Sequence, residues 1–285
     1  MVLFWPLPAA AQAVRHFEVE PALAFDATRS YPGDVDDDGD VDLVSTTLDG
    51  ALRWHPNDGA GNFGAAVILP FDAYGMVLLP PLDLDADGDV ELLLGADDDG
   101  LYAVDAVGAS RVVLSGWVVA LAQADLDGDG DLDLALSVDD QLRWSENLGG
   151  GVFAATTVVD LVDRIAAPAA GDIDGDGRVD LVSASIADGW IRWYPNRGPS
   201  GFGAAVDVVQ AVHPGAVHLA DLDGDGAPDL VTSDDATGAV WTLRNAGGGA
   251  FEPPVAVPLP LPEVYAVDDL DADGDVDLLA GSVHL

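Results

Sequence analysis

The sequence has no cysteine and no lysine, and its ten basic residues, all arginine, stand against 51 acidic ones. The lack of cysteine excludes disulfides, thiolate metal sites and a cysteine nucleophile. A formal net charge of −41 leaves no basic face for phosphates, so nucleic acid and anionic membrane surfaces are poor candidate partners. No apolar run reaches the ~20 residues of a membrane span. With 49% hydrophobic residues, the chain still has ample material for a folded core.

The acidic residues are concentrated in a repeat. Six similar strings, here called acidic loops 1 to 6, occupy 34–42, 83–91, 125–133, 172–180, 221–229 and 269–277, at successive offsets of 42 to 49 residues. An apolar run precedes each loop, and a second follows it. In most units two further runs come next, separated by turns rich in Gly, Asp and Asn. Short runs of Val, Leu, Ala and aromatic residues between turns predict four β-strands per repeat.

This organisation predicts an all-β fold. Four strands in a period of 40 to 50 residues fit a β-propeller blade, so the six repeats over 1–285 predict one propeller of six four-stranded blades. The last repeat lacks its third strand, which residues 2–6 resemble, as 16–23 resemble a fourth strand. Residues 1–13 therefore either supply the closing strand of the last blade or are the remnant of a signal peptide that ends in an A-x-A site at 11–13. In the second case the chain is truncated, and seven or more blades are the alternative.

The acidic loops have the pattern of a metal site. Carboxylates at positions 1, 3, 5 and 9 offer oxygen ligands, glycine at position 6 allows a sharp turn, and the variable position 7 contributes only its backbone carbonyl. The carboxylate ligands expected are Asp34, Asp36, Asp38 and Asp42; Asp83, Asp85, Asp87 and Glu91; Asp125, Asp127, Asp129 and Asp133; Asp172, Asp174, Asp176 and Asp180; Asp221, Asp223, Asp225 and Asp229; and Asp269, Asp271, Asp273 and Asp277. Position 7 is occupied by Asp40, Asp89, Asp131, Arg178, Ala227 and Asp275.

An oxygen-only ligand set favours Ca²⁺, which accepts six to eight oxygens in flexible geometry. Zinc and copper are disfavoured, because the loops contain neither cysteine nor histidine. We therefore expect about six structural Ca²⁺ ions, one in each turn between the first two strands of a blade. Catalysis or calcium sensing by the loops is the alternative. Without metal, the clustered carboxylates repel one another, which predicts that calcium stabilises the protein.

The DxDxDGxxD loops, together with the pairs Phe63-Gly64 and Phe202-Gly203, resemble the FG-GAP or VCBS-type repeats of integrin α-chain propellers and of many secreted bacterial proteins. The resemblance covers nearly the whole chain. It implies a β-propeller with structural Ca²⁺ in each loop and a secreted or extracellular location, with a bacterial-type cell surface or periplasm also possible. Members of this family include adhesion receptors, lectins and propeller domains attached to hydrolases or lyases.

The sequence singles out no catalytic residue or organic cofactor, and we expect no enzyme activity. Three recurring tryptophans, Trp54, Trp144 and Trp193, form either a set of stacking platforms for a ligand or filler between adjacent blades. The function expected is a calcium-stabilised binding or adhesion module for proteins or neutral glycans, with a lectin-like protein as one form of it. The alternatives are the propeller domain of a secreted polysaccharide-degrading enzyme and a structural scaffold for protein interactions. The oligomeric state cannot be read from the sequence.

Overall fold

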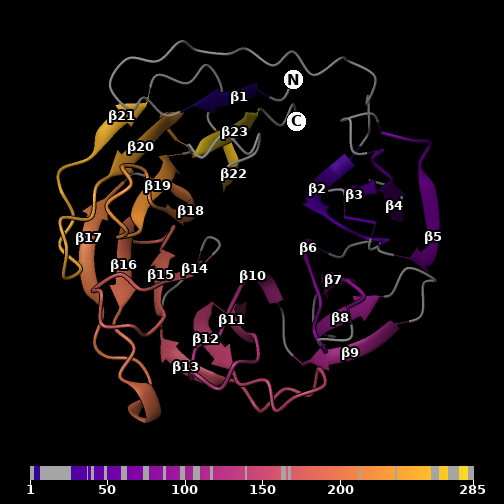
Figure 1. Cartoon of the computed structure of the whole chain (residues 1–285), viewed down its shortest axis with the longest axis horizontal. Coiled ribbons are helices and arrows are strands. Elements are labelled where there is room, and N and C mark those ends of the chain that lie inside the picture. The colour runs from indigo at the N-terminus through magenta and orange to yellow at the C-terminus, as the bar shows by residue number, and fades with distance from the viewer. Residues whose placement is uncertain are drawn as a thin grey trace.

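The computed structural model describes residues 3–6, 27–36, 38–39, 42–47, 50–58, 63–72, 77–85, 88–96, 100–104, 110–115, 118–138, 140–161, 165, 168–211, 213–234, 236–257, 263–268 and 276–281. These residues form antiparallel sheets that lie around a common centre (Figure 1). Besides the strands they contain one 3₁₀ turn, Gly198–Ser200. No helix in this described part of the chain has the length and apolar character needed to cross a membrane.

The sheets follow one another in chain order, and neighbouring strands in the sequence pair within each sheet. Sheet 1 contains β2 (Ala27–Gly33), β3 (Asp42–Thr47), β4 (Ala51–His55) and β5 (Val67–Asp72). Sheet 2 contains β6 (Val77–Leu82), β7 (Glu91–Ala96), β8 (Gly100–Val104) and β9 (Ser110–Leu114); sheet 3 contains β10 (Val118–Ala124), β11 (Asp133–Val138), β12 (Gln141–Ser145) and β13 (Thr157–Asp160). Sheet 4 contains β14 (Ala169–Gly171), β15 (Asp180–Ala184), β16 (Trp190–Tyr194) and β17 (Val206–Gln210); sheet 5 contains β18 (Pro214–Ala220), β19 (Asp229–Asp234), β20 (Ala239–Leu243) and β21 (Val255–Val257).

Sheet 6 joins strands from both ends of the sequence. It contains β22 (Glu263–Asp268) and β23 (Asp277–Gly281), and its third strand is β1 (Leu3–Pro6). Leu3 lies opposite Ala280, and Trp5 lies opposite Leu278. The pairing expected for residues 2–6 is therefore present in the backbone over 3–6. The possible fourth strand, 16–23, and the possible signal remnant up to residue 13 lie beyond the described residues.

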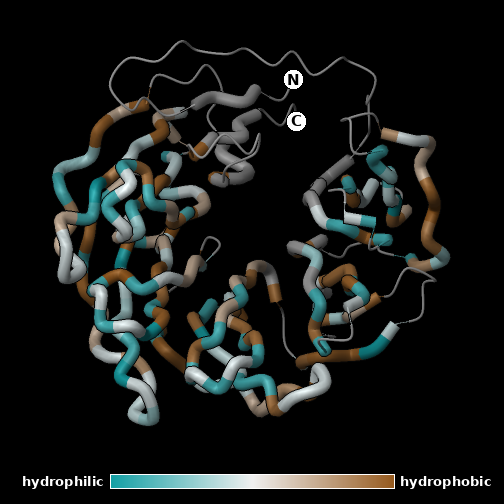
Figure 2. Tube along the Cα trace, in the orientation of Figure 1, coloured by the Kyte–Doolittle hydropathy of each residue, from teal (hydrophilic) through white to brown (hydrophobic). Residues whose placement is uncertain are grey.

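The burial of each strand explains its composition. Every residue of the second strands β11 and β19 is buried, whereas β5, β13 and β21 are mostly exposed. A strand covered on both faces by neighbouring sheets must be apolar at consecutive positions, so β11 reads DLALSV. The hydrophobic residues accordingly recur in each of sheets 1 to 5 and are not gathered in one central core (Figure 2).

Each hydrophobic cluster combines residues of two consecutive sheets. Between sheets 1 and 2, Val44 and Leu52 pack with Leu92 and Val104. Equivalent clusters join sheets 2 and 3, sheets 3 and 4, and sheets 4 and 5, and Val267 of β22 packs against the cluster of sheet 5. Face-to-face packing of four-stranded sheets in chain order is the architecture of a β-propeller. The predicted all-β propeller fold is confirmed at this level.

Candidate metal centres in the acidic loops

Acidic loops 1 to 5 connect the first and second strands of sheets 1 to 5, as the repeat predicts. The glycine at position 6 has a φ between +85° and +100° in all five loops. This left-handed conformation disfavours any residue with a Cβ atom, which explains why glycine recurs there. Loop 6 cannot be compared, because 269–275 lie outside the described residues. Its ligands Asp269, Asp271, Asp273, Asp275 and Asp277 therefore remain a prediction.

The carboxylate at position 1 holds the turn of its loop. In loop 3, Asp125 Oδ1 accepts a hydrogen bond from the Gly128 N–H at 2.7 Å, and Oδ2 accepts one from Gly130 at 3.1 Å. Asp172 and Asp221 accept the equivalent bonds in loops 4 and 5. Side-chain acceptance of nearby backbone N–H groups is typical of Asp in tight turns. The loop backbone is thus held in place by its own first residue.

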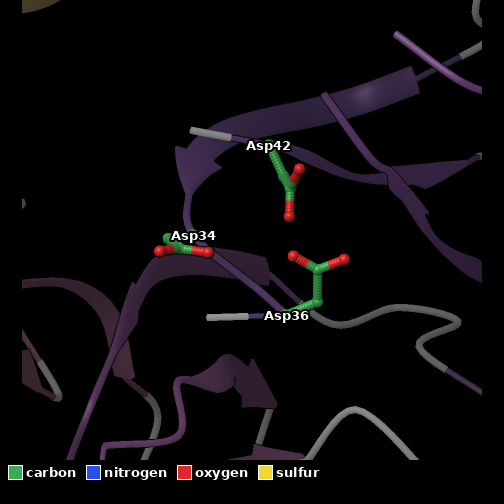
Figure 3. Close-up of side chains that lie close together, drawn as sticks. All are labelled: Asp34, Asp36 and Asp42. Carbon is green, nitrogen blue, oxygen red and sulfur yellow. The ribbon is translucent and has the colours of Figure 1, made fainter. Parts of the chain in front are cut away.

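In four of the loops, three carboxylates converge. Each set offers oxygens that all lie within 4.8 Å of one another. Figure 3 shows Asp36 and Asp42 of loop 1 facing each other, with Asp34 beside them. The sets are Asp34, Asp36 and Asp42; Asp125, Asp127 and Asp133; Asp172, Asp174 and Asp180; and Asp221, Asp223 and Asp225.

Electrostatics favour a cation at these points. Burial raises the pKa of Asp36, and the negative charges of Asp38, Asp42 and Asp34 raise it further. The pKa of Asp127 is also raised, first by burial and then by the charges of Asp129 and Asp125. A divalent cation would offset this mutual repulsion, and hard carboxylate oxygens are the ligands that Ca²⁺ prefers. The converging carboxylates therefore fit calcium, which would bind to them by direct coordination.

The carboxylate at position 9 is buried and also serves the backbone. Asp180 is fully buried; its Oδ2 accepts the N–H of Ile173 at 3.0 Å, and its Oδ1 accepts the N–H of Asn196 at 2.7 Å. The same two bonds occur at Asp42, Asp133 and Asp229. Burial raises the pKa of Asp133, Asp180 and Asp229, and the backbone hydrogen bonds partly offset the rise. Position 9 thus links its loop to the chain that follows the third strand.

Position 5 lies outside most of the converging sets among the described residues. Only loop 5 has position 5, Asp225, in its converging set, and there position 9 is not part of the set. Asp129, Asp176 and Asp225 each accept the backbone N–H of position 7 through Oδ1. The described residues of loop 2 contain no converging set of three carboxylates. Asp40 and Asp87 lie outside the described residues, and ligation by the position 7 carbonyl remains a prediction.

Three buried asparagines, Asn147, Asn196 and Asn245, connect consecutive sheets, and we call them the latch asparagines. Asn196 Nδ2 donates to the carbonyl of Leu126 in loop 3 at 2.7 Å and to that of Val179 in its own loop 4 at 2.8 Å. Its Oδ1 accepts the N–H of Gly198 at 2.8 Å. Asn147 bridges loops 2 and 3 in the same way, and Asn245 bridges loops 4 and 5.

The latch asparagines and the position 9 carboxylates together form a continuous series of hydrogen bonds. In loop 3, the Asp133 carboxylate accepts a hydrogen bond from the backbone N–H of Leu126, and the Leu126 carbonyl accepts one from the side-chain amide of Asn196. The backbone N–H of Asn196 in turn donates to the Asp180 carboxylate of loop 4. The same links extend back to Glu91 of loop 2 and forward to Asp229 of loop 5. The recurring Asn was visible in the sequence, but its partner 63 to 72 residues away was not.

The three recurring tryptophans pack between sheets. Trp193 is 5% exposed and lies in the cluster shared by sheets 4 and 5. Trp144 packs edge-on against Phe202, with ring centroids 6.2 Å apart. Trp54 is half-buried and donates its Nε1 hydrogen to Asp42 Oδ2 at 2.8 Å. Trp193 thus fills space between adjacent sheets, and a stacking role for the three tryptophans stays a prediction.

The antiparallel sheets pack against one another in chain order, and in sheets 1 to 5 an acidic loop connects the first strand to the second. This arrangement defines a β-propeller built from repeats that each carry an acidic loop. The FG-GAP-like repeat model matches residues 34–94, 125–183, 172–232 and 221–280, and each match begins at the first residue of an acidic loop. The chain belongs to the FG-GAP-like repeat family.

Two solved lectins have a similar structure. One, from Agrocybe aegerita, is described as specifically recognising non-reducing terminal N-acetylglucosamine; it is 18% identical, covers 92% of this chain and 76% of its own, and has a TM-score of 0.61. The other, the BP39L lectin from Burkholderia pseudomallei, is 13% identical, covers 85% of this chain and 74% of its own, and has a TM-score of 0.66. At these identities the likeness establishes the shared fold. No curated protein matches the chain.

Proposed function

We propose that this chain is a calcium-stabilised propeller that acts as an extracellular binding module. The observation that carries the calcium proposal is the convergence of three carboxylates at the same place in four of the repeats. The family pattern extends the proposal to loop 6 by sequence. Calcium has a structural role here, because the loops join the strands and, through the latch asparagines, the neighbouring sheets.

The blade number proposed is six. It rests on the six repeats and on the pairing of β1 with β23, which gives sheet 6 a third strand from the N-terminal end of the sequence. A last sheet that contains strands from both ends of the sequence ties those ends together and closes the ring of blades. The alternative, a propeller with more blades, would require β1 to pair with a sheet other than that of β23.

The ligand class proposed is a neutral glycan. The two lectins that share the fold support a carbohydrate-binding module over an enzyme. A cavity of about 520 Å³ lies among loops 1, 2 and 3, and its lining includes Gln123, whose side-chain amide is assigned to neither a metal nor an ion pair. An amide can both donate hydrogen bonds to sugar hydroxyl groups and accept them, whereas an anionic glycan would be repelled by the net charge of −41. A protein ligand is the second candidate.

Two measurements test the proposal. Thermal unfolding before and after complete calcium removal tests the metal: each occupied site contributes about 2.7 kcal/mol when free Ca²⁺ is a hundred times its Kd, so Tm should fall by several degrees for each site that is emptied. An unchanged Tm would contradict the calcium proposal. A glycan array probed in calcium tests the ligand class: binding to neutral glycans is expected, and a complete lack of glycan binding would leave the protein ligand as the function to pursue.

A further inference from the structure

Loop 2 differs from the other described loops in its electrostatic partner. The side chain of Arg111, on β9, extends toward the loop: its Nη2 lies 3.6 Å from Asp85 Oδ2 and 3.5 Å from Glu91 Oε1. These two carboxylates hold positions 3 and 9, which belong to the converging sets of loops 1, 3 and 4. A single guanidinium thus lies between two residues that would otherwise share a metal ion.

The register of the sheets shows how Arg111 reaches this place. Tryptophan occupies the matching position on the third strand of sheets 1, 3 and 4, where it lies opposite Val44, Ala135 and Val182. Sheet 2 has Ala103 there, opposite Leu93, and Arg111 lies opposite Ala103 on the next strand. Because alanine leaves the volume of an indole ring vacant, the arginine side chain can enter from the outer strand.

Glycines in the sheets that follow sheets 2 and 4 support the view that Arg111 fills the space of a tryptophan ring. A Cβ atom added to Gly249 of sheet 5 would lie 2.2 Å from the ring of Trp193 in sheet 4. Gly151 occupies the equivalent position in sheet 3, and a Cβ atom there would lie 2.7 Å from Arg111 Nη2. Arg111 Nη1 also donates to the Gly151 carbonyl at 3.0 Å. The guanidinium of Arg111 therefore occupies the place against the following sheet that the tryptophan ring occupies elsewhere.

The side chain that donates a hydrogen bond to the position 9 carboxylate also differs between sheets 1 and 2. In sheet 1, Trp54 Nε1 donates to the position 9 carboxylate, Asp42. In sheet 2, Arg111 Nη2 contacts the position 9 carboxylate, which is Glu91, the one glutamate among these positions. The longer side chain of glutamate and the charge of arginine thus occur in the same repeat. The neutral indole donor has been replaced by a full positive charge.

Two other loops show that an arginine alone does not remove a converging set. Arg178 contacts Asp176 in loop 4, and Arg244 contacts Asp223 in loop 5. Each of these arginines pairs with a single carboxylate, and both loops keep their converging carboxylates. In loop 2, Arg111 contacts two, and the described residues show no converging set. The positive charge of Arg111 thus lies beside the carboxylates of Asp85 and Glu91 and offsets their mutual repulsion.

We propose that Arg111 takes the place of the calcium ion in loop 2, so that this loop is held together without metal while loop 3 requires it. The proposal rests on calcium binding by the other loops. A guanidinium already bridging positions 3 and 9 repels a divalent cation and occupies the carboxylates that would coordinate it. The propeller then binds one Ca²⁺ fewer than the number of its acidic loops.

Hydrogen exchange with and without calcium tests the proposal in the unmodified protein. Peptides covering 125–133 should become protected when Ca²⁺ is added, whereas peptides covering 83–91 should exchange equally in both conditions. Equal calcium protection of both loops would overturn the role of Arg111 and leave the calcium proposal intact. If neither loop responds, the calcium proposal itself fails, and the role of Arg111 fails with it.

Variants test the same point by calorimetric calcium titration. Arg111→Met should add one Ca²⁺ to the stoichiometry, with the affinity of loop 2 raised about tenfold. The double variant Trp144→Ala/Thr157→Arg gives sheet 3 the alanine and the arginine that sheet 2 carries at these register positions, and it should remove one Ca²⁺. Arg192→Met is the matched control, because Arg192 pairs with Asp188 and Asp207 away from the acidic loops, and its stoichiometry should not change. Unchanged stoichiometry and affinity in Arg111→Met would contradict the proposal.

Discussion

Replacement of a latch asparagine tests whether the buried hydrogen bonds hold the sheets together. Asn196→Ala removes two donated bonds, to Leu126 and Val179, and one accepted bond, from Gly198. Asn196 is 2% exposed, so water cannot readily replace these bonds. At about 1 kcal/mol for each bond, the free energy of unfolding should fall by roughly 3 kcal/mol. For a chain of this size, that corresponds to a decrease in Tm of roughly 6 to 12 °C.

The assay is calorimetric unfolding in saturating calcium, so that metal occupancy is the same in both proteins. Gln210→Ala is the matched control: it also removes a side-chain amide that donates to a backbone carbonyl, that of Asp188 at 3.1 Å, but Gln210 is exposed. Its Tm should change by no more than about 1 or 2 °C. If Asn196→Ala and Gln210→Ala were equally stable, the bonds between loops 3 and 4 would contribute nothing to the fold, and the latch interpretation would be wrong.

Three further predictions follow from the same structure. Burial raises the pKa of Asp133, Asp180 and Asp229 above the ordinary value of 3.8, so between the two values the folded chain binds more protons than the unfolded chain. The free energy of unfolding of the calcium-free protein should therefore fall as the pH rises through that window, which urea unfolding at a series of pH values would measure; a rise would contradict the burial argument. Calcium affinity, in contrast, should increase with pH over the same window, because Ca²⁺ binds the ionised carboxylates, and a titration at two pH values would check this. Gly95→Ala should unfold the protein or lower its Tm far more than Gly128→Ala. A Cβ atom at Gly95 would lie 1.9 Å from the Val118 carbonyl oxygen of the next sheet, whereas Gly128 has open space around it and only its φ of +86° disfavours a Cβ atom. Similar Tm values for the two variants would show that the sheets can separate at this point.

Much of the fold could be predicted because its determinants are local. A period of 42 to 49 residues, turns rich in glycine and largely apolar second strands such as β11 are enough to predict stacked four-stranded sheets. A closing strand in the last sheet was one of two alternatives that the sequence offered for its first residues, since residues 2–6 carry the pattern of a third strand that the last repeat lacks. The register, with Trp5 opposite Leu278, was not predicted. The features that were predicted depend on strand propensity and burial, which a single repeat already displays.

The acidic loops were predicted in position but only partly in chemistry. The spacing identified Asp125, Asp127 and Asp133, which the structure brings together. It could not show that position 9 is also a backbone acceptor, because its partner Asn147 follows the third strand, 14 residues away. Nor could it show that Arg111 approaches loop 2, since that contact requires the register of β8 and β9 and the absence of tryptophan at Ala103. Contacts between repeats depend on sheet packing, which no sequence pattern within one repeat reveals.

The latch asparagines also bear on how such a chain can change in length. The third and fourth repeats each supply a donor to the repeat before and, through the carbonyl at position 2 of the acidic loop, an acceptor to the repeat after. Duplication of a repeat would therefore add both a donor and an acceptor for the hydrogen bonds between repeats, and deletion of a repeat would remove both. Repeats joined in this way can be gained or lost as whole units without new residues having to arise at the joints. Families of propellers with different blade numbers could evolve from one such repeat.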